Sequence, residues 1–149
     1  MEKKKISILG AGGAGACAAL ELSQRGYSVD LYEEGPTPIR KASYVNEGKI
    51  HLGFIYAMDH DLHTAKQMIL GSLHFISNLK RWIDIKPEDL ISTPFNYCVH
   101  RGSLMSPDEL ASHYQECINI FNTYKAEYKK SYLDLFDSIE ANLLTKKEA

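Results

Sequence analysis

Three glycines near the N-terminus have the spacing that suits a ligand carrying phosphate groups. Gly10, Gly12 and Gly15 follow a mostly apolar run at residues 6–9 in a G-x-G-x-x-G pattern. The first glycine permits a tight turn, the second lets the backbone approach a pyrophosphate, and the third lets a helix pack closely on a strand. A helix expected over residues 13–24 would direct its N-terminal N–H groups at the phosphates. The pattern predicts a dinucleotide-binding turn.

An acidic residue stands where such a turn needs one. Residues 29–32 are expected to form a second strand, and Glu33 follows it, 23 residues after Gly10. A carboxylate at this point accepts hydrogen bonds from ribose hydroxyls and repels a 2′-phosphate, which disfavours NADP. Gly26 is suited to end the intervening helix. The order predicts an α/β fold with a Rossmann-like βαβ unit; a glycine-rich turn in another kind of α/β protein is the alternative.

Composition limits the class of protein. The chain has 149 residues, a formal net charge of −2 and 44% hydrophobic residues. This charge gives no electrostatic case for a nucleic-acid or anionic-membrane partner, and no apolar run is long enough for a transmembrane segment. The three cysteines are odd in number and widely spaced, as is typical of reduced cytosolic thiols. We therefore expect a cytoplasmic protein without a nucleic-acid partner.

The rest of the sequence predicts loops, helices and short strands that would position further residues. A loop at residues 34–38 leads to a region with an expected short strand at 50–54. An apolar stripe predicts a helix over residues 62–83, and alternation predicts a strand over 95–99. Ser106, Pro107 and Glu109 have the order of a capping box that starts another helix, reaching at least residue 124.

One histidine cluster allows a metal site as an alternative interpretation. Residues 59–63 read D-H-D-L-H, which places two aspartates and two histidines close together. The same composition is ordinary at the polar entry to a helix, and a helix is expected to begin here. We therefore expect no metal site.

Two segments together resemble a known group of flavoenzymes. Residues 6–34 carry the dinucleotide pattern, and residues 42–56 carry a second motif. Within it, the stretch Lys49-Ile50-His51-x-Gly53-x-x-Tyr56 is similar to a K-x-I-H-x-G-x-x-Y stretch. The chain is similar in both segments to the FAD-dependent oxidoreductases of the D-amino-acid oxidase and glycerol-3-phosphate dehydrogenase superfamily. A simple NAD-binding module would leave the second motif unexplained.

The resemblance implies FAD as cofactor and a role for each matching residue. The pyrophosphate would lie on the glycine turn, formed by Gly10, Ala11, Gly12, Gly13, Ala14 and Gly15. The adenosine ribose would bind Glu33, with Glu34 as the alternative. The second motif would place four residues near the phosphates, ribityl chain or flavin, namely Ser43, Asn46, Gly48 and Lys49. His51 would lie near the isoalloxazine; for His51 and Lys49 an ordinary surface or structural role is the alternative.

Flavoenzymes of this group are usually much longer than this chain. We therefore expect residues 1–61 to be a FAD-binding Rossmann-like segment and residues 62–149 to be the start of an interdomain and substrate region, an incomplete, mainly helical appendage. A complementary C-terminal polypeptide is then an expected partner, beside a small-molecule substrate. No catalytic residue can be assigned from the sequence.

The expected function is hydride transfer to flavin from an amine, an amino acid or a hydroxy compound. Two alternatives are an NAD-binding oxidoreductase module and a catalytically inactive dinucleotide-binding or interaction fragment. Bound flavin would separate FAD from NAD binding, and turnover with a complementary fragment would separate an enzyme from an inactive module.

Overall fold

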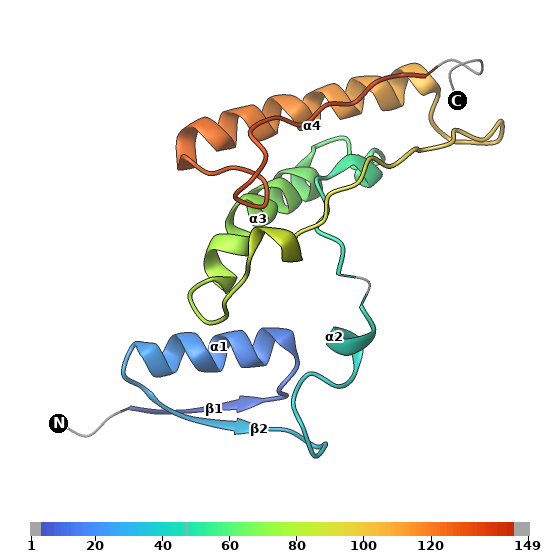
Figure 1. Cartoon of the computed structure of the whole chain (residues 1–149). Coiled ribbons are helices and arrows are strands. Elements are labelled where there is room, and N and C mark those ends of the chain that lie inside the picture. Colours follow the sequence, from blue (N-terminus) through green and yellow to red (C-terminus); the bar gives the residue numbers. More distant parts are fainter. Residues whose placement is uncertain (1–3, 47, 145–149) are drawn as a thin grey trace. The chain divides into compact units, whose positions relative to one another are not determined.

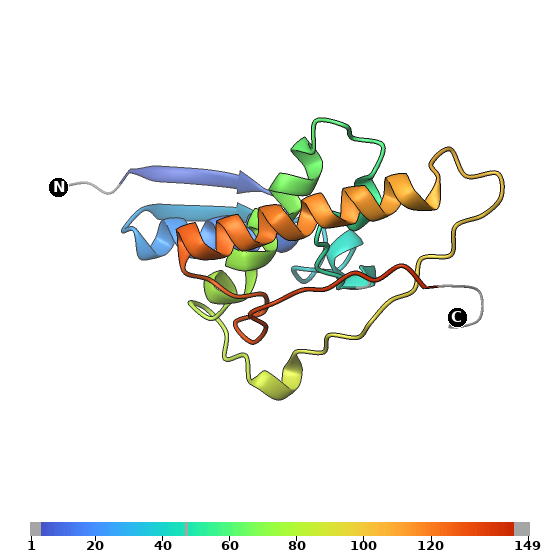
Figure 2. The ribbon, with the colours of Figure 1, turned by 90° about the horizontal axis from the view of Figure 1, so that it is seen from above.

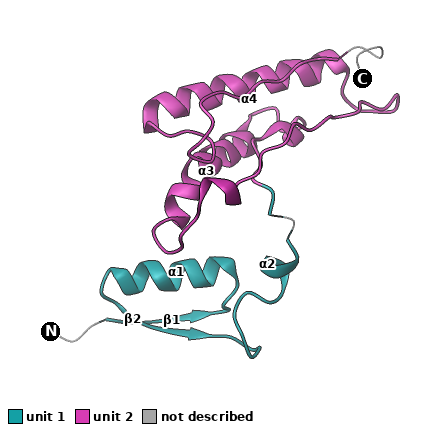
Figure 3. Cartoon of the chain, viewed as in Figure 1, with its two compact units in different colours: residues 1–49 teal, residues 50–149 magenta. Residues whose placement is uncertain are grey.

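The computed structural model describes residues 4–46 and 48–144. They form two compact units, residues 1–49 and residues 50–149, which are described separately. Figure 3 shows the two units in different colours, and Figure 1 labels their elements. The first unit has an α/β fold, and the second is mainly helical with long irregular connections.

The first unit is built around a β-α-β arrangement. Strand β1 (Lys5–Leu9) leads to helix α1 (Gly13–Gln24), and strand β2 (Ser28–Tyr32) returns parallel to β1. In the register Lys5 lies opposite Ser28 and Leu9 lies opposite Tyr32. Figures 1 and 2 show α1 running along one face of the strand pair. The predicted bounds of this helix are confirmed, and the second strand starts one residue earlier than predicted.

Two glycines let helix α1 lie close to the two strands of this unit. A Cβ at Gly15 would lie only 1.9 Å from the carbonyl oxygen of Gly10, so α1 can approach the end of β1 only if this side chain is absent. Gly26 has φ +88°, the left-handed conformation that favours glycine after a helix end. Its N–H donates to the carbonyl oxygen of Ser23, which reverses the chain toward β2.

The segment after β2 differs from the prediction. A loop leads to the short helix α2 (Ala42–Val45), which the sequence did not indicate. The strand predicted over residues 50–54 is wrong: this stretch leads into the 3₁₀ turn η1 (Phe54–Tyr56). Gly53 has φ +88°, and this conformation ends extended backbone before a strand can form.

Helices α3 (His63–Leu79) and α4 (Pro107–Tyr128) pack together in the second unit. Apolar side chains from both helices and from η1 form the core of this unit, namely Phe54, Ala65, Ile69, Leu73, Cys117 and Phe121. Helix α3 confirms the predicted apolar stripe but ends four residues before the predicted boundary.

The start of α4 follows the capping prediction in detail. The Ser106 hydroxyl accepts a hydrogen bond from the Glu109 N–H at 3.2 Å, and the Glu109 carboxylate accepts one from the Ser106 N–H at 2.7 Å. These bonds satisfy two backbone donors that the first turn leaves unpaired. The helix ends before Lys129, which has φ +52°.

The strand predicted over residues 95–99 is wrong. This stretch is irregular and follows the short 3₁₀ turn η2 (Pro87–Asp89). Phe95 and Tyr97, expected on a buried face, are both more than half exposed. Within the described residues no strand pairs with this stretch, and alternation alone does not make a strand without a partner. No helix in the described part of the chain is long and apolar enough to cross a bilayer.

Candidate dinucleotide site

The glycine turn joins the end of β1 to the start of α1. Gly10 has φ +94°, and its N–H donates to the carbonyl oxygen of Tyr32 at 2.8 Å, which ties the turn to the end of β2. Gly12 is the N-terminal cap of α1, and its carbonyl oxygen accepts the N–H of Ala16. The N–H groups of the first turn of α1 have no acceptor within the helix, so they are available to partners outside it, as in a phosphate-binding helix.

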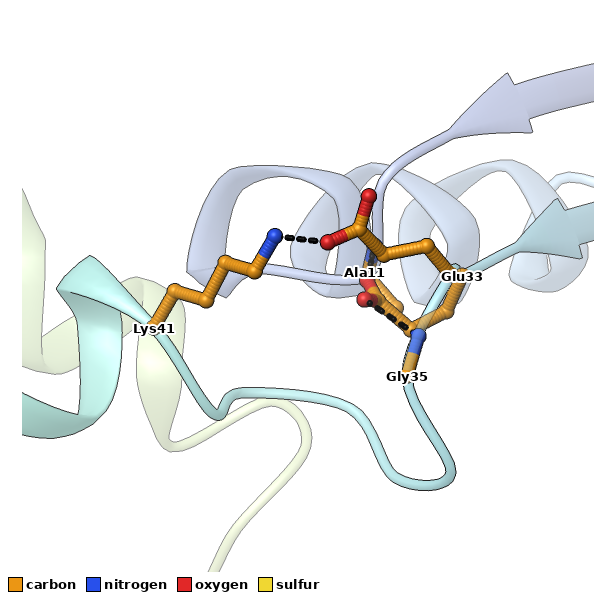
Figure 4. Close-up of polar contacts among 5 residues, drawn as sticks. Ala11, Glu33, Gly35 and Lys41 are labelled. Carbon is orange, nitrogen blue, oxygen red and sulfur yellow. Dashed lines mark hydrogen bonds and ion pairs between the residues drawn. The ribbon is translucent and has the colours of Figure 1, made fainter.

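Glu33 reaches back from the end of β2 to this turn. Its carboxylate accepts hydrogen bonds from the Ala11 N–H at 2.7 Å and from the Gly35 N–H at 3.2 Å. Figure 4 shows the three residues together, with Lys41 extending toward the same region. The Ala11 N–H, and after it the Gly35 N–H, lowers the pKa of Glu33 below its usual value. Glu33 is therefore an anion that the backbone holds in a fixed position.

Glu34 has a different partner. It forms an ion pair with Lys41, and both side chains are largely exposed. The hydrogen bond and charge of Glu34 raise the pKa of Lys41. Of the two acids predicted as ribose ligands, only Glu33 contacts the glycine turn through a hydrogen bond that the structure shows.

Ser43 comes to the glycine turn from 30 residues away in the sequence. Its hydroxyl accepts a hydrogen bond from the Gly13 N–H at 2.9 Å. A Cβ at Gly12 or at Gly13 would lie 3.4 Å from this hydroxyl oxygen. The two glycines thus give the start of helix α2 room to approach the start of α1.

These groups surround an open pocket of about 610 Å³ within the first unit. Its lining combines the glycine turn, the end of β2 and the segment before α2, namely Leu9, Gly10, Gly12, Tyr32, Glu33, Glu34, Ile39, Arg40, Lys41, Ala42 and Ser43. The sequence analysis missed Arg40 and Lys41. Their only signal in the sequence was a pair of adjacent cations shortly before Ser43.

Several predicted site residues do not line this pocket. Ala11 is buried, and its carbonyl oxygen accepts the Ile39 N–H at 2.9 Å. Asn46 accepts a hydrogen bond from the Gly48 N–H at 2.7 Å, and Gly48 has φ +68°. The remaining glycine-turn residues lie in the first turn of α1, namely Gly13, Ala14 and Gly15.

The K-I-H-x-G segment at residues 49–53 is divided between the two units. Lys49 is the last residue of the first unit, whereas His51 belongs to the second. There the His51 ring contacts the Tyr56 ring edge-on, with 6.4 Å between centroids. The roles of Lys49 and His51 toward a flavin stay predictions.

A buried polar contact from His113 reaches Gly53, in the second half of that segment. The Nε2 of His113 lies 3.2 Å from the Gly53 carbonyl oxygen and 3.5 Å from the Cys117 sulfur. A Cβ at Gly53 would lie 2.9 Å from Ala65, so the turn packs directly on α3. Desolvation raises the pKa of the Cys117 thiol to about 11, which makes it a packing residue rather than a nucleophile.

The histidine cluster before α3 forms the start of that helix. The Asp59 carboxylate accepts the Thr64 N–H at 2.6 Å, and this bond lowers the pKa of Asp59. His63 Nε2 lies 3.0 Å from the side-chain nitrogen of Gln67, one turn further along α3. The described residues contain no group of three or more histidine, cysteine or acidic side chains placed to hold a metal ion.

Comparison with known proteins gives a family match over most of the chain. The family described as FAD dependent oxidoreductase matches residues 5–133. The chain is 34% identical over 79 residues to the tRNA 5-methylaminomethyl-2-thiouridine biosynthesis bifunctional protein MnmC of Pseudoalteromonas atlantica, which covers 53% of the chain and 11% of that protein. No solved structure matches the chain.

A second relative matches over a shorter segment. The methylenetetrahydrofolate–tRNA-(uracil-5-)-methyltransferase TrmFO of a Sulfurihydrogenibium species is 48% identical over 46 residues, which covers 29% of the chain and 10% of that protein. The matched segments thus span about a tenth of the length of each of these two relatives.

Proposed function

Because the chain belongs to the family of FAD-dependent oxidoreductases, we propose that its first unit binds the adenosine diphosphate half of FAD. The observation that carries this proposal is the position of Glu33. Its carboxylate is held at the glycine turn by the Ala11 N–H, at the edge of an open pocket. An acid fixed at this place is the group that a ribose requires.

Glu33 has acceptor capacity left for a ligand. A carboxylate offers about four lone-pair sites, and the backbone N–H groups of Ala11 and Gly35 use two of them. The ribose hydroxyls would donate to the others. A 2′-phosphate would instead meet a fixed negative charge, so the same arrangement disfavours NADP.

The phosphate end of the site would consist of backbone donors and two cations. The N–H groups of Gly13 and Ala14 belong to the first turn of α1, where a helix attracts anions. Arg40 and Lys41 line the same pocket and would add positive charge toward the pyrophosphate. The geometry of the first unit therefore fits a dinucleotide with an unmodified ribose.

The second motif is what favours FAD over NAD in this proposal. Within the first unit, Ser43, Asn46, Gly48 and Lys49 would extend the site toward the ribityl chain, as the resemblance implies. FAD, when bound, supplies the acceptor for a hydride equivalent from substrate. The protein residues named here would bind and orient it; no residue is assigned as a catalytic acid or base.

The substrate class follows from the family and stays a proposal. We expect an amine, an amino acid or a hydroxy compound. Both relatives carry names that refer to tRNA, so a substrate panel should contain tRNA beside small amines and hydroxy acids. Oxidation of tRNA alone would contradict the expectation that the chain has no nucleic-acid partner.

A titration with three nucleotides tests the cofactor assignment. FAD fluorescence, or its displacement by NAD and NADP, would be followed with the whole chain and with Gly12→Val. A valine at position 12 would place a side chain where the backbone has to approach the pyrophosphate, and its Cβ would meet only an ordinary 3.4 Å contact with the Ser43 hydroxyl oxygen, without a backbone clash. We expect FAD to bind the wild type more tightly than NAD, and Gly12→Val to bind neither.

The two alternatives predict different titrations. NAD binding without FAD binding would favour an NAD-dependent module. Failure of all three nucleotides to bind a folded chain would favour the inactive interaction fragment and would contradict the proposed function.

A further inference from the structure

Residues 38–43, here called the strap, lie against the glycine turn of the first unit. Near one end, the Ile39 N–H donates to the Ala11 carbonyl oxygen at 2.9 Å. At the other end, the Ser43 hydroxyl accepts the Gly13 N–H at 2.9 Å. Between these two anchors Lys41 pairs with Glu34, which lies just after β2. The strap is therefore fastened along its length to the elements that form the pocket.

The Ser43 hydroxyl already accepts the Gly13 N–H, a hydrogen-bond donor that the proposed ligand needs. The first N–H groups of α1 have no partner within the helix and are the natural donors to a phosphate oxygen. In this structure the Gly13 N–H already has an acceptor, the Ser43 hydroxyl. One N–H makes one well-aligned hydrogen bond, so a phosphate oxygen can take this donor only after Ser43 has left it.

Ile39, which anchors one end of the strap, has a strained backbone conformation. Its φ is +55°, in the left-handed region where a β-branched residue is a rare outlier. The side chain is 45% exposed, so burial supplies little compensation. Strain of this kind persists where the surrounding contacts impose it, and it is common in segments that change conformation.

We propose that the strap is a gate on the nucleotide site. While Ser43 holds the Gly13 N–H the phosphate end is closed, and a dinucleotide binds when the strap has lifted from Gly13 and Ala11. The Ser43 hydroxyl then changes from acceptor of an N–H to donor toward a phosphate oxygen, which a hydroxyl can do by rotation. This inference rests on the proposed function, because it concerns access to the same site.

The gate makes the association rate depend on how firmly the strap is held to the glycine turn. The second-order association rate constant is multiplied by the fraction of molecules whose strap is open. Ser43→Ala removes one fastening and should raise this constant about fivefold. Ile39→Gly relieves the left-handed strain, stabilises the closed strap and should lower it about fivefold. Ile39→Val keeps a β-branched residue and is the matched control.

Stopped-flow mixing of the whole chain with FAD measures this constant from the change in flavin fluorescence. The expected order of association rate constants is Ser43→Ala first, then wild type and Ile39→Val, then Ile39→Gly. A Ser43→Ala variant that changes only the dissociation rate would overturn the gate, because Ser43 would then be a ligand contact alone. An Ile39→Gly variant that associates as fast as the wild type would overturn it as well.

A second measurement needs no nucleotide. Hydrogen exchange of the Gly13 amide, followed by NMR, should be faster in Ser43→Ala than in wild type and unchanged in Ser28→Ala, an exposed serine of the same unit. Equal exchange in all three proteins would overturn the gate. Failure of every variant to bind FAD would overturn both proposals, whereas FAD binding with equal association rates would overturn the gate alone.

Discussion

The carboxylate of Glu33 accepts a hydrogen bond from the backbone N–H of Ala11 at 2.7 Å, joining the end of β2 to the glycine turn. The two residues are 22 positions apart in the chain, and the parallel pairing of β1 with β2 brings them together. The protein's own backbone thus holds the acid at the turn, which reduces the ordering that binding would require.

Replacing Glu33 should weaken FAD binding selectively. Glu33→Gln keeps the size of the side chain but removes its charge and part of its acceptor capacity, so we expect an affinity loss on the order of tenfold. Glu34→Gln is the comparison variant: it loses its ion pair with Lys41 but keeps the Glu33 carboxylate on the Ala11 N–H, so its affinity loss should be the smaller of the two. Calorimetric titration measures both. A larger loss for Glu34→Gln would move the ribose contact to Glu34.

The stability of the first unit should depend on pH through Glu33. Its pKa is lowered from the usual 4.5, chiefly by the Ala11 N–H. A lowered folded-state pKa contributes stability that is present above 4.5 and is lost as the pH falls through the lower folded value.

Urea unfolding followed by the amide signals of β1 and β2 tests this dependence. The stability advantage of the wild type over Glu33→Gln should be present at neutral pH and should shrink in acid below the usual glutamate range. An advantage that is equal at neutral and acidic pH would show that the charge of Glu33 does not contribute.

Gly15 should tolerate no side chain. A Cβ there would lie 1.9 Å from the Gly10 carbonyl oxygen, so Gly15→Ala should destabilise the first unit by about 3 kcal/mol or more. Gly71→Ala is the control: it lies within α3 with open space around its Cβ, and alanine should stabilise that helix by about 0.5–1 kcal/mol. Similar effects of the two substitutions on thermal unfolding would contradict the packing described here.

The cysteines should differ in reactivity. Cys98 is exposed, whereas Cys117 is buried and its pKa is raised to about 11. Because the thiolate is the nucleophile, a thiol reagent at mildly alkaline pH should modify Cys98 quickly and Cys117 only after unfolding. Mass spectrometry of peptides from the native protein identifies the modified residue; rapid labelling of Cys117 would show that the α3–α4 core opens readily.

Removing His113 should loosen the turn that carries the second motif. His113→Leu would remove the 3.2 Å contact to the Gly53 carbonyl, which would keep the Tyr56 N–H at 3.0 Å as a donor, so we expect a cost of about 0.5–1.5 kcal/mol. His113→Gln can still donate from its side-chain amide and should recover part of this loss. Denaturant unfolding followed by Trp82 fluorescence compares the two variants, and equal stabilities would assign the contact no energetic role.

The elements that depend on local sequence were predictable. The glycine spacing and Gly26 predicted the bounds of α1, and the order of Ser106, Pro107 and Glu109 predicted the start of α4. Both depend on neighbours within one helical turn. The family resemblance likewise came from two short segments, and the match over residues 5–133 confirms it.

The features that depend on distant partners were not predictable. The stretches at residues 50–54 and 95–99 have strand-like patterns, but a strand also needs a neighbour to pair with, which a pattern cannot supply. Arg40 and Lys41 line the pocket because the loop after β2 folds back on the glycine turn. The strained Ile39 and the contact of Ser43 with Gly13 follow from the same fold-back.

The most direct test of the central claim is a visible absorption spectrum of the purified chain after incubation with FAD and desalting. The account predicts retained flavin bands near roughly 370 and 450 nm, the usual absorption of this cofactor, and their loss in Gly12→Val. A colourless wild-type protein that is folded by circular dichroism would contradict the claim that the first unit holds FAD.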